Sequence, residues 1–478
     1  MTKKLVLILF VLISINAFAG NKIKYYFNQP VDTTVATAVK AQSLINCSAD
    51  TLIAYLNRAQ YSLDICLYDF DNDTNVLYHN GVNVANAINN AYSRGVKIRW
   101  IYEASCGNSG LALLNTNINT LGSPQGYPDY TIMHNKFVVI DGNSSNPNDP
   151  IVWTGCLNWY TQQFNWDYNN IVIIQDSALA HAYLGEFNMM WGDTGIAPNL
   201  TNSKFGQYKT DLGKHNFTIE GNHIELYFSP SDNTDSHIQS TIETANTDLY
   251  FGMYTFTVNT DAGLILYKYD SGIYVSGIDD SWSNTYSPYG AFTSTLGSHF
   301  KVYTETDTSL YHNKFLIVDP SDTCSDPTVL TGSHNWSNSA NTHNDENTLI
   351  IHNDTAANLF YQYFKATFNS LGGVLTPQTG CKHVNVPTYA SVENTTMIYP
   401  NPANSSFSIR YQLSTTQNVN IELYNMFGQK VAALVTNETL EPGAYYINNS
   451  LLVSGVYFVR FTIGNETYSR KLAIKGNQ

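Results

Sequence analysis

The chain has 478 residues, of which 43% are hydrophobic and 13% charged, and its formal net charge at pH 7 is −14. This length and apolar content exclude a disordered chain and allow two or three domains that each bury a core. The acidic balance argues against tight nonspecific binding to duplex nucleic acid, because it repels a phosphate backbone at long range. It does not exclude a phosphate substrate, since a few cations in a cleft can dominate locally.

The first nineteen residues have the pattern of a secretory signal peptide. Lys3 and Lys4 precede an apolar run that begins at Leu5, and small residues end the segment at Ala19. We therefore expect a signal peptide at 1–19 and export of the rest of the chain. The six cysteines would then lie in an oxidising compartment, which permits disulfides without fixing their pairing. No later apolar run is long enough to predict a transmembrane helix.

Strand-like and helix-like segments then alternate, and they do so twice in the same order. Apolar residues at helical spacing, such as Leu52 and Leu56, separate the strand patterns. The alternation predicts an α/β fold with two related halves, 20–200 and 201–370, each a mixed β-sheet flanked by helices. The corresponding strand patterns are 23–30, 63–70 and 95–101 in the first half and 224–230, 249–256 and 272–278 in the second.

The last part of the chain has a different residue pattern. Residues 371–392 are rich in Gly and Pro and predict a linker. From 393 to 478, short alternating strand patterns such as 407–413 and 456–463 follow one another with no helical period. This predicts a C-terminal all-β domain, a small sandwich.

Two nonapeptides, MHNKFVVID (133–141) and YHNKFLIVD (311–319), repeat a His, a Lys and an Asp at the same spacing. Residues two apart in a strand share a face, so the histidine and the lysine of each copy should point the same way. These side chains are His134, Lys136, His312 and Lys314. Asp141 and Asp319 fall at the strand ends, where we expect them to accept hydrogen bonds.

Each nonapeptide is followed by a matching second piece, TGCLNW (154–159) or TGSHNW (331–336), which carries Asn158 or Asn335 after a tight turn. A loop here can return an amide beside the histidine and lysine. Two imidazoles, two ammonium groups and two amides would form a pocket for a tetrahedral anion. One imidazole could attack phosphorus and the other protonate the leaving oxygen, while lysines and amides stabilise charge on the remaining oxygens.

The doubled HxK(x)4D pattern with its downstream Gly-Ser-x-Asn element resembles the phospholipase D superfamily over about 23–368. The resemblance implies metal-independent phosphodiester chemistry through a phosphohistidine, without a cofactor, with pseudo-twofold halves meeting at one site. It implies the catalytic residues His134, Lys136, Asn158, His312, Lys314 and Asn335. It implies the supporting residues Asp141, Asp319, Gly155, Gly332, Ser333, Glu346 and Asn169.

The first copy departs from the family pattern at two positions. Cys156 stands where the motif has Ser, and Asn169 stands where the second copy has Glu346. If Glu346 contacts His312, its charge favours the imidazolium and suits His312 to be the general acid. Asn169 would then leave His134 neutral. We therefore predict His134 as the nucleophile and His312 as the acid.

The C-terminal residues resemble a second known module. YPNPANSSFSIRYQL, LYNMFGQKV, SGVYFVRF and the closing RKLAIKG are similar to the type A sorting domain of the type IX secretion system, over about 393–478. The resemblance implies that the secretion machinery is a partner and that the protein is exported across the outer membrane, to be secreted or held at the cell surface. The alternative is an ordinary β-sandwich adhesion or carbohydrate-binding module.

Three functions are consistent with these observations. The first is a secreted phospholipase D that hydrolyses glycerophospholipids to phosphatidic acid and a free head group, acting as a monomer at a membrane surface. The second is a secreted nuclease of the same superfamily, and the third is a noncatalytic surface protein that uses the fold for binding. The repeated His and Lys residues argue against the third. The acidic composition favours lipid over nucleic acid, since we expect no basic stripe.

Overall fold

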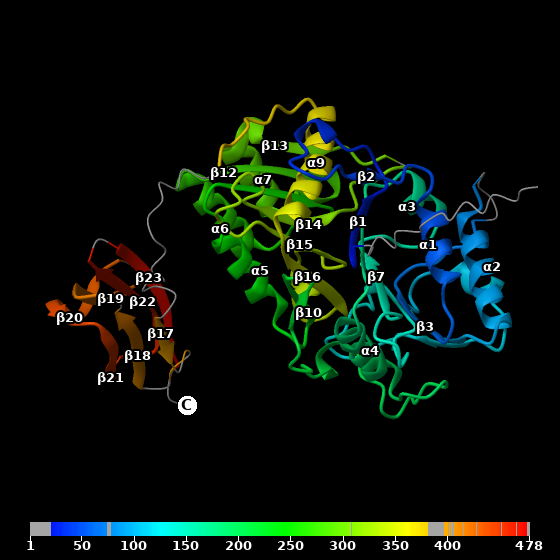
Figure 1. Cartoon of the computed structure of the whole chain (residues 1–478), viewed down its shortest axis with the longest axis horizontal. Helices are drawn as coiled ribbons and strands as arrows, with labels where there is room; N and C mark the ends of the chain where they lie inside the picture. Colours follow the sequence, from blue (N-terminus) through cyan, green and yellow to red (C-terminus); the bar gives the residue numbers. More distant parts are fainter. Residues whose placement is uncertain are drawn as a thin grey trace, which may run out of the picture. The chain divides into compact units, whose positions relative to one another are not determined.

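The computed structural model describes residues 21–73, 78–306, 308–380 and most of 396–475, where positions 400, 402, 404, 405, 414, 427, 451 and 465 are excepted. The predicted signal peptide and residues 381–392 of the predicted linker lie outside the described residues. The chain divides into two compact units, 1–382 and 383–478. Figure 1 shows their helices and strands in the order of the sequence.

The first half of the larger unit is built on an eight-stranded sheet with the order β2-β1-β8-β7-β6-β3-β4-β5. Its strands are β1 (Ile23–Phe27), β2 (Gln42–Ser43), β3 (Ser62–Leu67), β4 (Lys97–Tyr102), β5 (Asn119–Gly122), β6 (Lys136–Ile140), β7 (Ile151–Gly155) and β8 (Asn170–Ile174). Strand β3 pairs in parallel with β4 and antiparallel with β6, so the sheet is mixed. All five residues of β6 are buried, because helices or the other half cover both faces of this central strand.

The second half repeats this arrangement with the order β13-β12-β11-β14-β15-β16-β10-β9. Its strands are β9 (Asn216–Ile219), β10 (Asn222–Ser229), β11 (Asp248–Met253), β12 (Tyr274–Asp280), β13 (Phe300–Tyr303), β14 (Lys314–Val318), β15 (Thr328–Gly332) and β16 (Glu346–His352). In this order β14 takes the place that β6 holds in the first sheet. The predicted α/β fold with two related mixed sheets is confirmed.

The helices form two outer layers and one inner layer. Outside the sheets lie α1 (Ser48–Leu56) and α2 (Asn80–Ser93) on the first half, and α5 (Thr234–Glu243), α6 (Asn259–Asp270) and α7 (Ser287–Leu296) on the second. Two helices, α4 (Ser177–Trp191) and α9 (Asp354–Ser370), join the inner faces of both sheets in one central cluster. The short helices α3 (Thr161–Asn165) and α8 (Asn338–Thr342) follow the two Thr-Gly turns.

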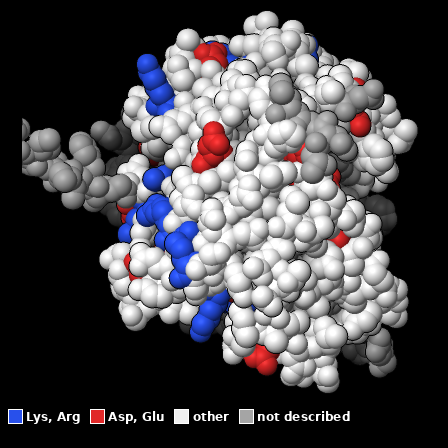
Figure 2. Space-filling view, turned by 90° about the vertical axis from the view of Figure 1, so that its right-hand side faces the viewer, with Lys and Arg blue, Asp and Glu red and all other residues white. Residues whose placement is uncertain are grey.

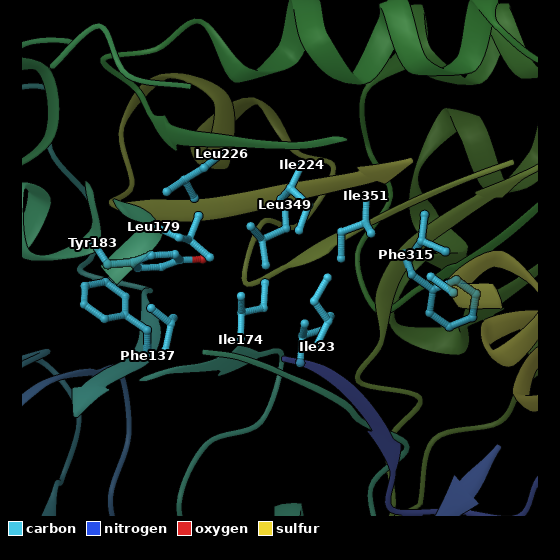
Figure 3. Packing of buried hydrophobic residues seen from close by; sticks show 14 of the residues in the cluster. Ile23, Phe137, Ile174, Leu179, Tyr183, Ile224, Leu226, Phe315, Leu349 and Ile351 are labelled. Carbon is cyan, nitrogen blue, oxygen red and sulfur yellow. The ribbon is translucent and has the colours of Figure 1, made fainter. Parts of the chain in front are cut away.

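The central cluster joins the two halves into one body. Figure 3 shows Ile23 and Ile174 of the first sheet facing Ile224, Leu349 and Ile351 of the second. Burying a side chain of this size contributes about 1.5–3 kcal/mol, so the shared cluster is a large part of the stability of the unit. Alternate residues of the two central strands, β6 and β14, belong to this cluster: Phe137, Val139, Phe315 and Ile317.

The smaller unit is a β-sandwich. One sheet has the order β17-β18-β21 and the other β20-β19-β22-β23, and both contribute to one apolar core. The strands are β17 (Met397–Tyr399), β18 (Ser406–Leu413), β19 (Gln417–Asn425), β20 (Lys430–Leu440), β21 (Gly443–Ser450), β22 (Gly455–Ile463) and β23 (Glu466–Ile474). The predicted all-β sandwich is confirmed. In neither unit do the described residues include a helix of the length and apolarity needed to cross a bilayer.

Cysteine pairing is partly defined. Cys324 is disulfide-bonded, whereas Cys47, Cys66, Cys106 and Cys156 are free thiols.

Candidate active site

The two repeated histidines lie at equivalent places, two residues before the central strand of each sheet. Lys136 is the first residue of β6 and Lys314 is the first residue of β14. Each lysine Nζ donates a 2.8 Å hydrogen bond to the backbone oxygen of its own histidine, His134 or His312. All four side chains are buried. The histidine and lysine of each copy therefore lie close together, as the strand period predicts.

The halves meet at the segments that carry these histidines. The backbone N–H of His134 donates to Asp345 O at 2.9 Å, and the N–H of Asp345 donates to Ile132 O at 3.0 Å. On the other side of the pseudo-twofold axis, the N–H of Tyr168 donates to Leu310 O at 2.8 Å. The chain before each histidine thus runs beside the chain that leads into the last strand of the opposite half.

This crossing decides which side chain supports which histidine. His134 Nδ1 lies 2.8 Å from Glu346 Oε2 and 2.9 Å from its Oε1. His312 Nδ1 lies 3.0 Å from Asn169 Oδ1. The predicted contact between Glu346 and His312 is therefore wrong, because β16 begins beside the first half and β8 beside the second. Each histidine is supported by a residue of the other half.

The turns after β7 and β15 hold these supporting side chains. Ser333 Oγ donates to Glu346 Oε2 at 2.6 Å, and Cys156 Sγ lies 3.2 Å from Asn169 Oδ1. Gly332 has a φ of +154°, and a Cβ there would lie 2.2 Å from Asn347 O. At Gly155, with φ +141°, a Cβ would lie 2.3 Å from Asn170 O. Only glycine permits so close an approach of the two backbones in each half.

A second polar network crosses the interface, and the sequence did not predict it. Asn347 Nδ2 donates to Asn135 Oδ1 at 3.0 Å and its Oδ1 accepts from Thr154 Oγ1 at 2.9 Å. In the related position, Asn170 Nδ2 donates to Asn313 Oδ1 at 3.2 Å and its Oδ1 accepts from Thr331. Two sequence features could have predicted this network: the identical Asn in both HNK triplets and the Thr in both Thr-Gly turns. These buried bonds fix the histidine-bearing segments against the opposite half.

Two tyrosines, also missed in the sequence, cover the histidine and lysine side chains. The Tyr68 ring lies 4.7 Å from the His134 ring and 4.9 Å from Lys136 Nζ. The Tyr254 ring lies 5.1 Å from the His312 ring, and 5.0 Å from Lys314 Nζ. The sequence could have predicted this pair, because the two tyrosines occupy the same place in the corresponding strand patterns 63–70 and 249–256.

Burial sets the protonation of the four central groups. It lowers the pKa of Lys136 to about 7 and that of Lys314 to about 8. Burial, with the two nearby ammonium groups, also holds the pKa of His134 and of His312 well below the usual value. Both imidazoles are therefore neutral near pH 7. An Nδ1–H directed at Glu346 or Asn169 leaves Nε2 of each ring as a base.

The predicted amides and aspartates take different positions. Asn158 and Asn335 follow the two Thr-Gly turns, and within the described residues the Oδ1 of each has no hydrogen-bond partner. Asp141 accepts bonds from the backbone N–H groups of residues 60–62, and Asp319 accepts from those of 246–248. The two aspartates are strand-end acceptors, as predicted, and they close the end of each sheet away from the histidines.

Carboxylates and aromatic rings surround the histidine and lysine pairs. We call Asp69, Asp167, Asp280 and Glu305 the acidic rim. The aspartates interact electrostatically with the lysines. The charge of Lys136 lowers the pKa of Asp69, and the charges of Asp280 and Asp167 raise the pKa of Lys314. Burial raises the pKa of each of the three aspartates to about 6, so they are largely ionised at neutral pH.

A cavity of about 690 Å³ opens beside the second half of this rim. It is lined by Trp282, Tyr286, Glu305 and Leu310 among others. Trp282 is 53% exposed, and its ring stacks on Tyr254 with centroids 6.4 Å apart and planes at 13°. Tyr254 in turn contacts His312, so Trp282 and Tyr254 lie between the cavity and the second histidine.

Two α/β halves that share one buried pair of histidines and lysines define the phospholipase D class of fold. Residues 52–191 and 238–368 match the family model described as "Cardiolipin synthase, PLD-like domain". The chain belongs to this family, whose members include phosphodiester-cleaving enzymes. Residues 397–475 match the "Secretion system C-terminal sorting domain", which indicates export across the outer membrane to the cell surface or the medium.

Individual relatives match parts of the chain. A mitochondrial cardiolipin hydrolase from Xenopus tropicalis is 32% identical over 149 residues, which is 29% of this chain and 59% of that protein. Among solved structures, phosphatidylserine synthase from Haemophilus influenzae superposes with a TM-score of 0.47 at 14% identity, over 67% of this chain and 83% of that one. Nuc, a phospholipase D family member from Salmonella typhimurium, covers 30% of this chain and 93% of its own, at 25% identity and a TM-score of 0.26. The chain thus spans less than two thirds of the length of the curated relative.

Proposed function

We propose that the protein is a secreted phospholipase D that hydrolyses glycerophospholipids to phosphatidic acid and a free head group. His134 acts as the nucleophile and His312 as the general acid. The crossed support of the two histidines is the observation that carries the assignment of their roles. The contacts are the reverse of those expected from the sequence, and the assignment now rests on the ability of Glu346 to stabilise the cation that forms on a phosphorylated His134, not on protonation of His312 by Glu346.

Glu346 suits His134 to attack phosphorus. Its carboxylate accepts the Nδ1–H of His134 at 2.8 Å, which directs the Nε2 lone pair away from Glu346 and toward a substrate. When Nε2 forms a bond to phosphorus, the ring becomes cationic, and a buried carboxylate at this distance stabilises that cation. Ser333 holds the carboxylate in place. Lys136 and Lys314 would stabilise the charge on the phosphoryl oxygens.

Asn169 suits His312 to give up a proton. An amide oxygen at 3.0 Å from Nδ1 orients the ring without adding a negative charge that would hold the proton. The bound phosphodiester supplies the anion that favours protonation of His312. As the phosphorus–nitrogen bond forms, the bond to the head-group oxygen breaks and His312 protonates that oxygen. In the second step neutral His312 takes a proton from water, which attacks phosphorus and releases His134.

The acidic rim favours a lipid head group over a polynucleotide. Asp69, Asp167, Asp280 and Glu305 would repel the flanking phosphates of a nucleic acid strand. The same carboxylates, with the exposed ring of Trp282, would attract the ammonium group of a zwitterionic lipid. We therefore propose phospholipids with cationic head groups, such as phosphatidylethanolamine, as the preferred substrates.

The expectation that no basic stripe exists is wrong for this structure. Figure 2 shows a row of Lys and Arg side chains on the side that carries α1 and α2. Lys24 and Arg58 both lie over the Tyr55 ring, and Arg94 donates to Asn57 O. Lys97, in the same region, begins β4, whereas the rim lies beyond the other ends of the strands. The row is therefore remote from the histidines and does not line a path for nucleic acid to them.

The test uses the chain without its signal peptide, in EDTA, on vesicles of phosphatidylethanolamine, vesicles of phosphatidylglycerol, and single- and double-stranded DNA. We expect phosphatidic acid from phosphatidylethanolamine, with the activity lost in His134→Asn. Cleavage of DNA alone, lost in the same variant, would make the protein a nuclease. No activity on either class would support the noncatalytic function.

A second variant tests the rim. Glu305 is exposed, so Glu305→Gln removes one charge without disturbing the core. We expect kcat/KM to fall severalfold for phosphatidylethanolamine and to stay unchanged for phosphatidylglycerol. An equal effect on both lipids would contradict the proposed head-group preference while leaving the phosphodiesterase assignment intact.

A further inference from the structure

Three side chains gather at the end of the second sheet that lies away from the histidines. His223 and Glu225 are two residues apart on β10, so they share a face, and His352 on β16 pairs directly with His223. One ligand atom from each lies within 4.8 Å of the other two. At its opposite end the same pair of strands brings Ser229 beside Glu346 of the catalytic site. The cluster and the catalytic site therefore occupy opposite ends of two paired strands.

The remaining polar atom of each side chain is already held by a neighbour. His352 Nδ1 lies 2.7 Å from Asp326 Oδ2, and His223 Nε2 lies 2.8 Å from Asn216 Oδ1. Tyr227 donates its hydroxyl proton to Glu225 Oε2. His352 Nε2 and Glu225 Oε1 lie 2.9 Å apart, and Nδ1 is the ring nitrogen of His223 that Asn216 does not contact. Metal-binding side chains have this arrangement, because outer partners fix the orientation of each ligand.

We propose that His223, Glu225 and His352 bind one divalent transition-metal ion, with Zn²⁺ as the reference ion. Two imidazole nitrogens and one carboxylate oxygen are a donor set typical of zinc, with a water molecule as the fourth ligand. Ca²⁺ and Mg²⁺ prefer oxygen ligands and do not fit this set. The 2.9 Å between His352 Nε2 and Glu225 Oε1 is close to the spacing of about 3–3.5 Å between ligands around a tetrahedral ion.

Without metal, His352 lies between the carboxylates of Asp326 and Glu225, with the ring of His223 4.6 Å from its own. A bound ion would replace the direct contact between His352 and Glu225 and would connect β10 to β16.

The test uses the full chain without its signal peptide and without a polyhistidine tag. Calorimetric titration with ZnCl₂ at pH 7 should give one ion bound per chain. Co²⁺ should give the visible absorption of a four-coordinate site. No binding of Zn²⁺ at pH 7 would overturn the proposal.

Variants separate this cluster from its surroundings. His223→Asn and His352→Asn should each weaken Zn²⁺ binding at least about tenfold. His223 is exposed, so His223→Asn should keep the metal-free Tm of the wild type while losing the Tm rise that Zn²⁺ produces. The matched control is His215→Asn, in the neighbouring group of Asp211, His215 and Asp232. Loss of zinc binding in this control, or binding unaffected in both His223→Asn and His352→Asn, would overturn the proposal.

Phospholipid hydrolysis gives an independent readout. Because the cluster lies at the far end of the strands, we expect His223→Asn to retain wild-type activity in EDTA. A failure of zinc binding would leave the phosphodiesterase proposal unchanged. A failure of phosphodiesterase activity would likewise leave the zinc proposal unchanged.

Discussion

The two halves of the catalytic unit share a backbone arrangement but differ in how their histidines are supported. His134 has a carboxylate and a hydroxyl behind it, from Glu346 and Ser333, whereas His312 has an amide and a thiol, from Asn169 and Cys156. The Nδ1–oxygen distances are similar, 2.8 Å and 3.0 Å, so the main difference between the two supports is the charge. A symmetric frame can thus assign unlike roles to two identical side chains through one buried charge.

The largest expected effect separates the two histidines. On a p-nitrophenyl phosphodiester, whose leaving group needs no proton, His134→Asn should lower kcat by about 10⁴-fold or more. His312→Asn should instead release one equivalent of nitrophenol in a burst and leave phosphate on His134, since the second step has lost its base. Rapid-quench kinetics and peptide mapping give both results. Phosphate found on His312 in the His134→Asn variant would reverse the roles.

The next largest effect is expected when the charge of the residue behind each histidine is changed. Glu346→Gln removes the carboxylate from the nucleophile and should lower kcat on phospholipid about 10³-fold. Asn169→Asp adds a carboxylate behind the acid, which raises the pKa of His312 and should slow proton donation only about tenfold. Steady-state kinetics on the same vesicles measures both. Equal losses in the two variants would show that the asymmetry has no catalytic role.

A smaller effect concerns the two lysines. Because the pKa of Lys136 is lowered to about 7 and that of Lys314 to about 8, each loses its charge as pH rises through that value. On the p-nitrophenyl phosphodiester, which needs neither a protonated His312 nor the acidic rim, we expect kcat/KM to fall above pH 7, with the acidic decline well below 6.5, where His134 titrates. Lys136→Arg should move the alkaline decline toward pH 8, while Lys314→Arg should leave it near 7. Profiles that coincide for both variants would contradict these assignments.

The smallest expected effect is at the thiol. Cys156→Ser gives the first half the residue that Ser333 supplies in the second, and the new hydroxyl can donate to Asn169. We expect kcat/KM within about threefold of wild type and a free energy of unfolding changed by less than about 1 kcal/mol. Denaturant unfolding measures the free energy of unfolding. A loss of tenfold or more would indicate that the thiol itself takes part in catalysis.

The fold was largely predictable from the sequence because its evidence is local and occurs twice. Alternating apolar residues such as Phe137 and Val139 define strands, and the spacing of His134 and Lys136 defines a shared face. The partner of Glu346 was not predictable, because it depends on how the halves are oriented. Asp280 and Glu305, which come from loops and strand ends, carry no motif, and His223 becomes a neighbour of His352 only through the pairing of β10 with β16.

The crossed support of the histidines also depends on joining both halves in one chain. If a single half associated as a homodimer, symmetry would place the same residue behind both copies of the histidine, either two carboxylates or two amides. Any substitution would then alter nucleophile and acid together. Duplication within one polypeptide removes that constraint, so position 169 can be Asn while position 346 stays Glu. Covalent linkage of the halves is thus what allows each histidine to be tuned without changing the other.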